Sequence, residues 1–213
     1  MIRARHLGLA AFFVASAARA DGEYPPDFRL PLRVGGGYDG QLHAGGLSTL
    51  PAIEVDVAKL SRGARLVLAA DFDAFIFPDA KAIQDQLKMR LGAAIGIIVR
   101  PTRSWALVVH EGGVMIVMND PGPAQTASVV GGGLATTAYL YPWYVPFDDT
   151  AGFEHSVTRA ILSGVAIWAR GEVDWTSYGR GGSLAMGMSL DVIRFLFSPI
   201  LSLVSPGPQR PVY

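Results

Sequence analysis

The longest regular pattern of apolar and polar positions covers Leu87–Arg100. Every second residue from Leu87 to Val99 is apolar, and the residues between them are charged, polar or very small, with Ile98 as the exception. This period of two predicts a β-strand, because a helix would spread both sets around its surface. Strands in soluble sheets are usually about five or six residues long. A longer strand with one apolar face and one polar or small face is typical of a membrane β-barrel.

Further segments show weaker alternation, and together they predict about eight strands. The expected strands are Phe28–Tyr38, Ala52–Lys59, Arg65–Phe77, Leu87–Arg100, Trp105–Met118, Ala127–Tyr141, Val157–Glu172 and Gly182–Phe195. The phase is broken at His110-Glu111-Gly112, which predicts a β-bulge there. The pattern as a whole predicts an all-β fold, an antiparallel up-and-down transmembrane β-barrel.

The lengths of the connections give a separate test, since membrane barrels alternate short periplasmic turns with longer outer loops. The expected connections are long at 39–51, short at 60–63, long at 78–85, short at 101–104 and long at 119–126. The next connection, 142–156, should be short and is long. The alternation therefore holds for the first five connections and fails at the sixth.

The N-terminus has the layout of a secretory signal peptide. Arg3, Arg5 and His6 are basic, Leu7–Ala15 is a short apolar core, and Ala18-Arg19-Ala20 matches a cleavage site. We therefore expect a signal peptide at 1–20, a barrel domain at 21–197 and a C-terminal tail at 198–213. An export signal together with a barrel indicates the outer membrane of a Gram-negative cell envelope.

Composition narrows the possible functions. Removing the signal peptide takes away three arginines and no acidic residue, so the mature chain has 18 acidic and 15 basic side chains. Without an excess of basic residues, nothing suggests a nucleic-acid partner. The chain has no cysteine, which excludes disulfides and thiolate metal sites. Only 17% of residues are charged and the mean hydropathy is +0.31. The longest uncharged run, Pro121–Phe147, is broken by glycines and prolines, so we expect no spanning helix.

The signal peptide, the alternating segment Leu87–Val99 with its turn at 100–104, and the strand Gly182–Val192 together resemble the small outer-membrane β-barrel family. This eight-stranded group includes OmpA-like and OmpW-like proteins. The resemblance implies a barrel over most of the mature chain. The chain departs from the family because residues 198–213 follow the last strand, whereas such barrels usually end on an aromatic residue.

Charged residues on the polar faces of two neighbouring strands form the first candidate site. Asp71 and Asp73 lie on one strand, and Lys88 and Arg90 on the next. A hairpin would bring these acids and bases together inside the barrel. They could line a narrow polar passage, but an eight-stranded barrel is only just wide enough for its side chains. We favour a salt-bridged plug, because unpaired charges in so narrow a space would be costly.

Aromatic residues cluster near the predicted strand ends. They are Tyr139, Tyr141, Trp143, Tyr144, Trp168, Trp175 and Tyr178. Such residues often form girdles at the membrane–water boundary, where the ring is in lipid and its polar group in water. A stacking site for a sugar or another ligand is the alternative, and we favour the girdle.

No residue pattern supports catalysis or metal binding. His155 and Ser156 could suggest a barrel hydrolase, but adjacent residues in a strand point to opposite faces. His43, His110 and His155 form no metal-ligand spacing. We therefore expect no enzyme activity, cofactor or metal.

The sequence thus predicts a non-catalytic outer-membrane protein with a structural or minor passage role. Membrane lipid is its expected partner, and the sequence identifies no protein partner. The alternative is a soluble secreted β-sandwich or a lipocalin-like barrel that binds an apolar ligand. The two differ in whether the continuous apolar face points outward to lipid or inward to a core.

Overall fold

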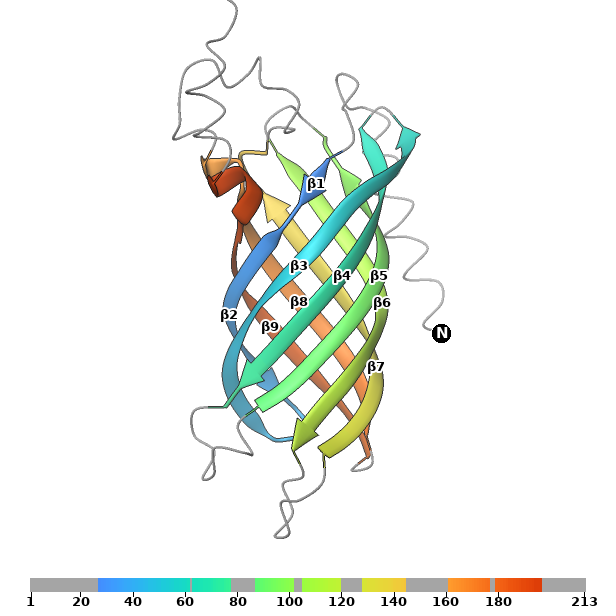
Figure 1. Ribbon diagram of the computed structural model, residues 1–213, viewed down its shortest axis with the longest axis vertical. Helices are drawn as coiled ribbons and strands as arrows, with labels where there is room; N and C mark the ends of the chain where they lie inside the picture. Colours follow the sequence, from blue (N-terminus) through green and yellow to red (C-terminus); the bar gives the residue numbers. More distant parts are fainter. Residues whose placement is uncertain are drawn as a thin grey trace, which may run out of the picture.

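The structure is an antiparallel β-barrel (Figure 1). This computed structural model describes residues 27–61, 63–77, 87–101, 105–119, 128–144, 161–176 and 179–196. Its strands are β1 (Phe28–Arg29), β2 (Pro31–Asp39), β3 (Ala44–Ser61), β4 (Ala64–Ile76), β5 (Leu87–Val99), β6 (Ala106–Asn119), β7 (Ser128–Tyr141), β8 (Val165–Thr176) and β9 (Gly179–Asp191). Within these ranges, no helix has the length and apolar character needed to cross a membrane.

The sheet closes on itself as a ring of eight strands, β2 to β9. Each strand pairs antiparallel with the next along the chain, and β9 pairs back onto β2 from Pro31–Asp191 to Asp39–Ser183. The short β1 precedes β2 and pairs with β3. The all-β, up-and-down barrel predicted from the sequence is therefore confirmed.

An even number of strands brings both ends of the barrel domain to the same rim. We call this rim the terminal end. It carries the start of β2, the end of β9 and the connections 62–63, 100–105 and 142–164. The opposite rim, here the far end, carries 40–43, 77–86, 120–127 and 177–178. The predicted alternation of loop lengths is therefore wrong at the first connection, which is short, and the longest connection lies at the terminal end.

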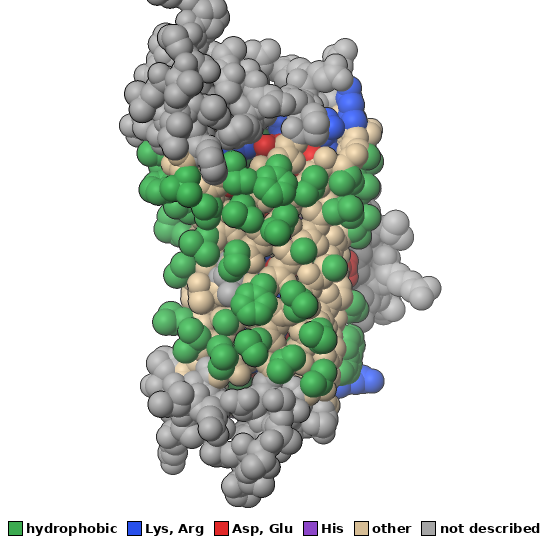
Figure 2. Space-filling view, in the orientation of Figure 1, with side chains coloured by type: hydrophobic (Ala, Val, Ile, Leu, Met, Phe, Trp, Pro, Cys, Tyr) green, Lys and Arg blue, Asp and Glu red, His purple; other side chains and the backbone are tan. Residues whose placement is uncertain are grey.

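Side chains alternate between the two faces of the wall along most of the strands, and most of the outward ones are apolar. On β5 the exposed residues include Leu91 and Ile95, at 53% and 55%, whereas Lys88 and Arg90 are buried inside. Figure 2 shows apolar side chains spread over the visible wall of the barrel. This distribution is the reverse of a soluble barrel, in which the apolar face would fill the interior.

The predicted bulge in β6 is wrong. β6 pairs residue by residue with β5 and with β7 without a register shift. His110 is buried inside and Glu111 is exposed outside, so the alternation continues through this region. The sequence pattern looked broken because a charged residue lies on the outward face and two glycines follow it. Register shifts occur instead in the β3–β4 pairing, near Asp56 and Lys59.

Several predicted strand boundaries also need correction. β3 begins at Ala44 and not at Ala52, because it runs through Pro51, which pairs with Leu32 of β2. β8 begins at Val165 and not at Val157. β9 ends at Asp191, after which residues 192–196 turn into a short helix, so the predicted extension to Phe195 is wrong. The predicted signal peptide and the tail 198–213 lie outside the described residues.

Glycine is required on β2 and β9 beside the Trp168 ring of β8. Gly35 pairs directly with Gly187, and Gly187 also pairs with Trp168. A Cβ atom at Gly35 would overlap the carbonyl group of Met186 and the Trp168 ring, and one at Gly187 would overlap the Val34 carbonyl oxygen. The missing side chains leave space for the indole inside a narrow barrel.

Candidate functional site: the charged lumen

The interior of the barrel is lined by buried charged side chains. The buried acids are Asp27, Asp39, Glu54, Asp56, Asp71, Asp73, Glu172, Asp174 and Asp191, and the buried bases are Arg29, Arg33, Lys88, Arg90, Arg100, Arg170 and Arg194. They reach the lumen because each occupies an inward position of its strand or lies at the terminal rim. Buried charges are tolerated only when they are paired. Their contacts place most of them in two groups, and Arg33, Asp71 and Arg170 form contacts outside these two groups.

The first group, the far-end cluster, consists of Asp39, Asp73, Lys88, Arg90, Glu172 and Asp174. Lys88 lies between two carboxylates: Nζ donates to Oδ2 of Asp39 at 2.8 Å and also to Asp174. Its side chain and both partners are fully buried. One cation thereby joins β5 to β2 and β8 across the lumen.

Arg90 is the centre of the far-end cluster. Its Nε donates to Glu172 at 2.8 Å, and its terminal nitrogens donate to Asp73 at 3.2 Å and to Ser183 at 2.9 Å. A further contact of 3.4 Å reaches Asp39. The planar guanidinium suits this role, because its donors point in several fixed directions at once.

The structure places all four predicted lumen residues inside the barrel but pairs them differently from the simple hairpin scheme. Asp73 and Arg90, opposite each other on β4 and β5, form an ion pair. Asp71 instead binds Arg170 of β8 and lies 3.8 Å from Arg33 of β2. Most pairs thus cross the lumen, because it is narrow enough for opposite walls to touch.

Several interior charges were missed by the sequence reading. Arg170, Glu172 and Asp174 occupy successive inward positions of β8, and Asp39 is the last residue of β2. The alternation that indicates an inward polar face is present in β8, whose outward positions include Ile167 and Val173. This alternation was not recognised, because the strand was predicted to begin eight residues too early and to end at Glu172, before Asp174.

The second group, the terminal-end cluster, closes the opposite rim. It consists of Asp27, Arg29, Glu54, Asp56, Arg100, Tyr144, Asp191 and Arg194. Arg29 donates to Glu54 at 2.9 Å and to Asp56 at 2.7 Å. These contacts join the short β1 to β3 and fix the start of the barrel.

Tyr144 organises the terminal-end cluster. The guanidinium groups of Arg100 and Arg194 lie 4.5 and 4.6 Å from the centre of its ring. Its hydroxyl group donates to Asp27 and accepts from Arg100 at 2.8 Å. Arg194 also binds Asp27 and, through Nε, Asp191 at 3.0 Å. The turn after β9 is thereby tied to the residue before β1.

Burial and charge act together on the ionisation of this cluster. Burial by itself would raise the pKa of Asp27, but Arg194 and Arg29 outweigh it and hold that pKa below the usual 3.8. Burial and the Asp27 charge raise the pKa of Tyr144 to about 12. At neutral pH the rim thus holds an ionised carboxylate and a neutral phenol.

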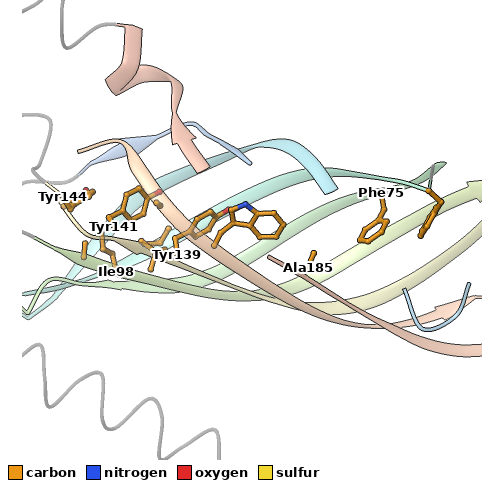
Figure 3. Packing of buried hydrophobic residues seen from close by; sticks show 12 residues of the cluster. Phe75, Ile98, Tyr139, Tyr141, Tyr144 and Ala185 are labelled. Atoms are coloured by element: carbon orange, nitrogen blue, oxygen red, sulfur yellow. The ribbon is translucent and has the colours of Figure 1, made fainter. Parts of the chain in front are cut away.

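Aromatic rings also occupy the lumen, beside these charged side chains. Figure 3 shows Tyr139, Tyr141 and Tyr144 following one another along the interior, with Phe75 farther along. Ring centres of Tyr139 and Tyr141 are 6.2 Å apart, and those of Tyr141 and Tyr144 are 5.4 Å apart. Trp168 is 1% exposed and its Nε1 donates to the carbonyl of Met188 at 3.0 Å.

The girdle prediction is therefore wrong for Tyr139, Tyr141, Tyr144 and Trp168, which face the lumen. They were grouped by their nearness to strand ends, whereas the parity of their positions places them inside. Trp143 and Trp175 are 50% and 41% exposed, one near each rim, and for these two residues the girdle stays a prediction. Tyr178 lies outside the described residues.

Within the described residues, no group of three or more potential ligands could hold a metal ion. His110 is buried, with Nε2 3.4 Å from Oε1 of Glu54. His155 and Ser156 lie outside the described ranges.

No protein-family model matches the sequence, and no curated protein matches it. Among solved structures, the fold is similar to Ail, the attachment invasion locus protein of Yersinia pestis, with a TM-score of 0.46 and 11% identity over 78% of this chain and 98% of that one. It is also similar to the Neisserial surface protein NspA, with a TM-score of 0.44 and 14% identity over 78% of this chain and 99% of that one. At these identities neither protein's role carries over.

The far-end cluster gives a double-mutant test. Arg90→Ala leaves Asp39, Asp73 and Glu172 without their shared cation, so we expect the free energy of unfolding to fall by about 3–5 kcal/mol. Adding Asp73→Ala should recover part of this loss, because one stranded carboxylate is removed. The measurement is urea unfolding in lipid vesicles. Arg180→Ala, at an exposed position, is the control and should change stability by less than about 0.5 kcal/mol. Additive effects of the two lumen substitutions would show that the residues do not interact.

The terminal-end cluster predicts an acid-sensitive rim. The pKa of Asp27 is lower in the folded protein than the usual 3.8, so its contribution to stability is complete above pH 4 or so and is lost as pH falls through the folded value. We expect the urea concentration at the midpoint of unfolding to decrease when the pH is lowered below about 4. Asp27→Asn should be less stable at pH 7 and should show a smaller further loss in acid. Equal pH dependence of the two proteins would contradict the assignment.

Proposed function

We propose that this protein is an outer-membrane barrel with a structural role, whose wall is embedded in lipid and whose lumen is closed by its own ion pairs. It acts as a stable, non-catalytic element of the cell envelope. The proposal includes an export signal at 1–20, a barrel domain at 21–197 and a tail at 198–213.

One observation carries the proposal: the closed ring is apolar outside and charged inside. Val34, Ile167 and Met188 are 57%, 57% and 62% exposed on the outer wall. Lys88, Arg29 and Asp174 are fully buried in the interior. Water would favour the opposite arrangement, because apolar surface exposed to water costs free energy. Lipid favours the observed one, because apolar side chains are compatible with hydrocarbon. The closed ring also leaves no unpaired strand edge in the hydrocarbon.

The alternative, a soluble lipocalin-like barrel, is not supported. Such a barrel holds an apolar ligand in an apolar interior. Here the lumen is filled by the far-end cluster, the terminal-end cluster and the aromatic rings between them. An apolar ligand would have to displace buried ion pairs to enter, which would leave charges without partners.

Membrane extraction tests the proposed function. We expect the wild-type protein to stay with the membranes after washing with urea and to be released only by detergent. Ile95→Arg should place a charge in hydrocarbon, cost roughly 2–4 kcal/mol near the bilayer midplane and reduce the folded amount in the membrane. Ile95→Leu, with the same exposure and no charge, is the matched control.

The soluble alternative predicts the opposite outcome. It would place a monomeric wild-type protein in the aqueous extract without detergent. Ile95→Arg would then fold as well as Ile95→Leu, because an exposed arginine in water costs little.

A further inference from the structure

Three buried charged side chains occupy the middle of the lumen and belong to neither cluster. Along their strands, Arg33 of β2, Asp71 of β4 and Arg170 of β8 lie between the residues of the far-end cluster and the terminal rim. Arg170 binds Oδ2 of Asp71, and Nη1 of Arg33 lies 3.8 Å from the same oxygen. The second distance is too long for a hydrogen bond, so Arg33 is near this carboxylate without being hydrogen-bonded to it.

Several polar atoms around these charges are buried and have no hydrogen-bond partner in the described part of the protein. They are Nη1 and Nη2 of Arg33, Nε of Arg170, Oδ1 of Asp71, Nε2 of His110 and the hydroxyl group of Tyr139. The rings of His110 and Tyr139 are 5.7 Å apart, and both residues interact electrostatically with Asp71. We call these five residues the central group. Buried polar groups nearly always have a partner, either in the protein or in an ordered water.

Some space is left beside Asp71. The lining of this hollow includes Asp71, His110, Thr137, Gly92, Ala94 and Gly112. The last three are small inward-facing residues of β5 and β6. Although the ring of strands is closed around it, the Asp71 side chain keeps 5% of its surface accessible, whereas the side chains of Lys88 and Asp174 in the far-end cluster keep none. The central group thus adjoins a space that only molecules as small as water can enter.

The atoms without partners require a guest that both donates and accepts hydrogen bonds. Arg33 and Arg170 can only donate, the carboxylate of Asp71 can only accept, and the hydroxyl group of Tyr139 can do either. An anion would be attracted by the arginines but repelled by the carboxylate beside them, and a cation would meet the reverse. An apolar molecule would satisfy none of these atoms. Water meets every requirement, and a buried water typically forms about three hydrogen bonds with otherwise unsatisfied groups.

We propose that the central group binds internal water, which is held in the middle of the lumen and cut off from both rims by the far-end and terminal-end clusters. The inference rests on the proposed closed lumen and gives a role to the charges that lie outside the two clusters. Water supplies the hydrogen bonds that Arg33 and Asp71 do not make to each other, so these charges stay solvated inside the barrel. The lumen is then closed by two ionic clusters on either side of a hydrated centre.

The sign of one substitution tests the proposal. Tyr139→Phe removes the buried hydroxyl group and keeps the ring. If water binds this hydroxyl group, the substitution removes a hydrogen bond, so we expect a lower urea concentration at the midpoint of unfolding in lipid vesicles. Removal of a hydroxyl group that has no partner would leave the midpoint unchanged or raise it, and this result would contradict the proposal. Tyr38→Phe changes an exposed tyrosine of the outer wall and is the matched control, for which we expect no change.

A high-resolution crystal structure of the wild-type barrel is the second test and needs no substitution. We expect ordered water within about 3.2 Å of Oδ1 of Asp71 and of an Nη atom of Arg33, confined to the centre of the lumen. Direct hydrogen bonds among the five side chains, with no water between them, would overturn the inference and leave the closed lumen intact. A continuous file of water from the centre to either rim would instead overturn the closed lumen itself.

Discussion

Closure of the strand ring is the constraint on which the rest of the structure depends. Each of the strands β2 to β9 bonds to two neighbours, so the ring has no edge strand. Closure also fixes which side chains point inward, because the pleat sends alternate residues to opposite faces. In a ring of eight strands the inward residues fill a space only wide enough for themselves. Charges placed there must find partners across the lumen.

The two ionic clusters are best understood as consequences of that narrow space. A buried ion pair contributes little net stability, since desolvation offsets the attraction, but removing one partner is costly. Lys88 and Arg90 therefore hold the far end in one arrangement of β2, β5 and β8. Arg29, Arg194 and Tyr144 do the same where the chain enters and leaves the barrel. With aromatic rings between the clusters, the interior is a packed core made largely of polar groups.

The fold was readable from the sequence where alternation was clean, and the site was only partly readable. The strand predicted at Leu87–Arg100 is observed at Leu87–Val99, one residue shorter, because one of its faces is apolar throughout. Asp73 and Arg90 were correctly placed together, since neighbouring strands of a hairpin face each other. Contacts across the lumen, such as Lys88 with Asp174, depend on barrel width and on which strands stand opposite. The girdle prediction was wrong for most of the aromatic residues for a different reason: nearness to a strand end does not determine which face of the strand a side chain occupies.

The closed lumen is the central claim, and ion conduction tests it most directly. The purified wild-type barrel is inserted into a planar lipid bilayer and the steady current is recorded under a constant voltage. Because both clusters and the rings between them occupy the lumen, we expect little or no steady conductance. Large, stable single-channel currents from the wild-type protein would show that the lumen is open and would contradict this account.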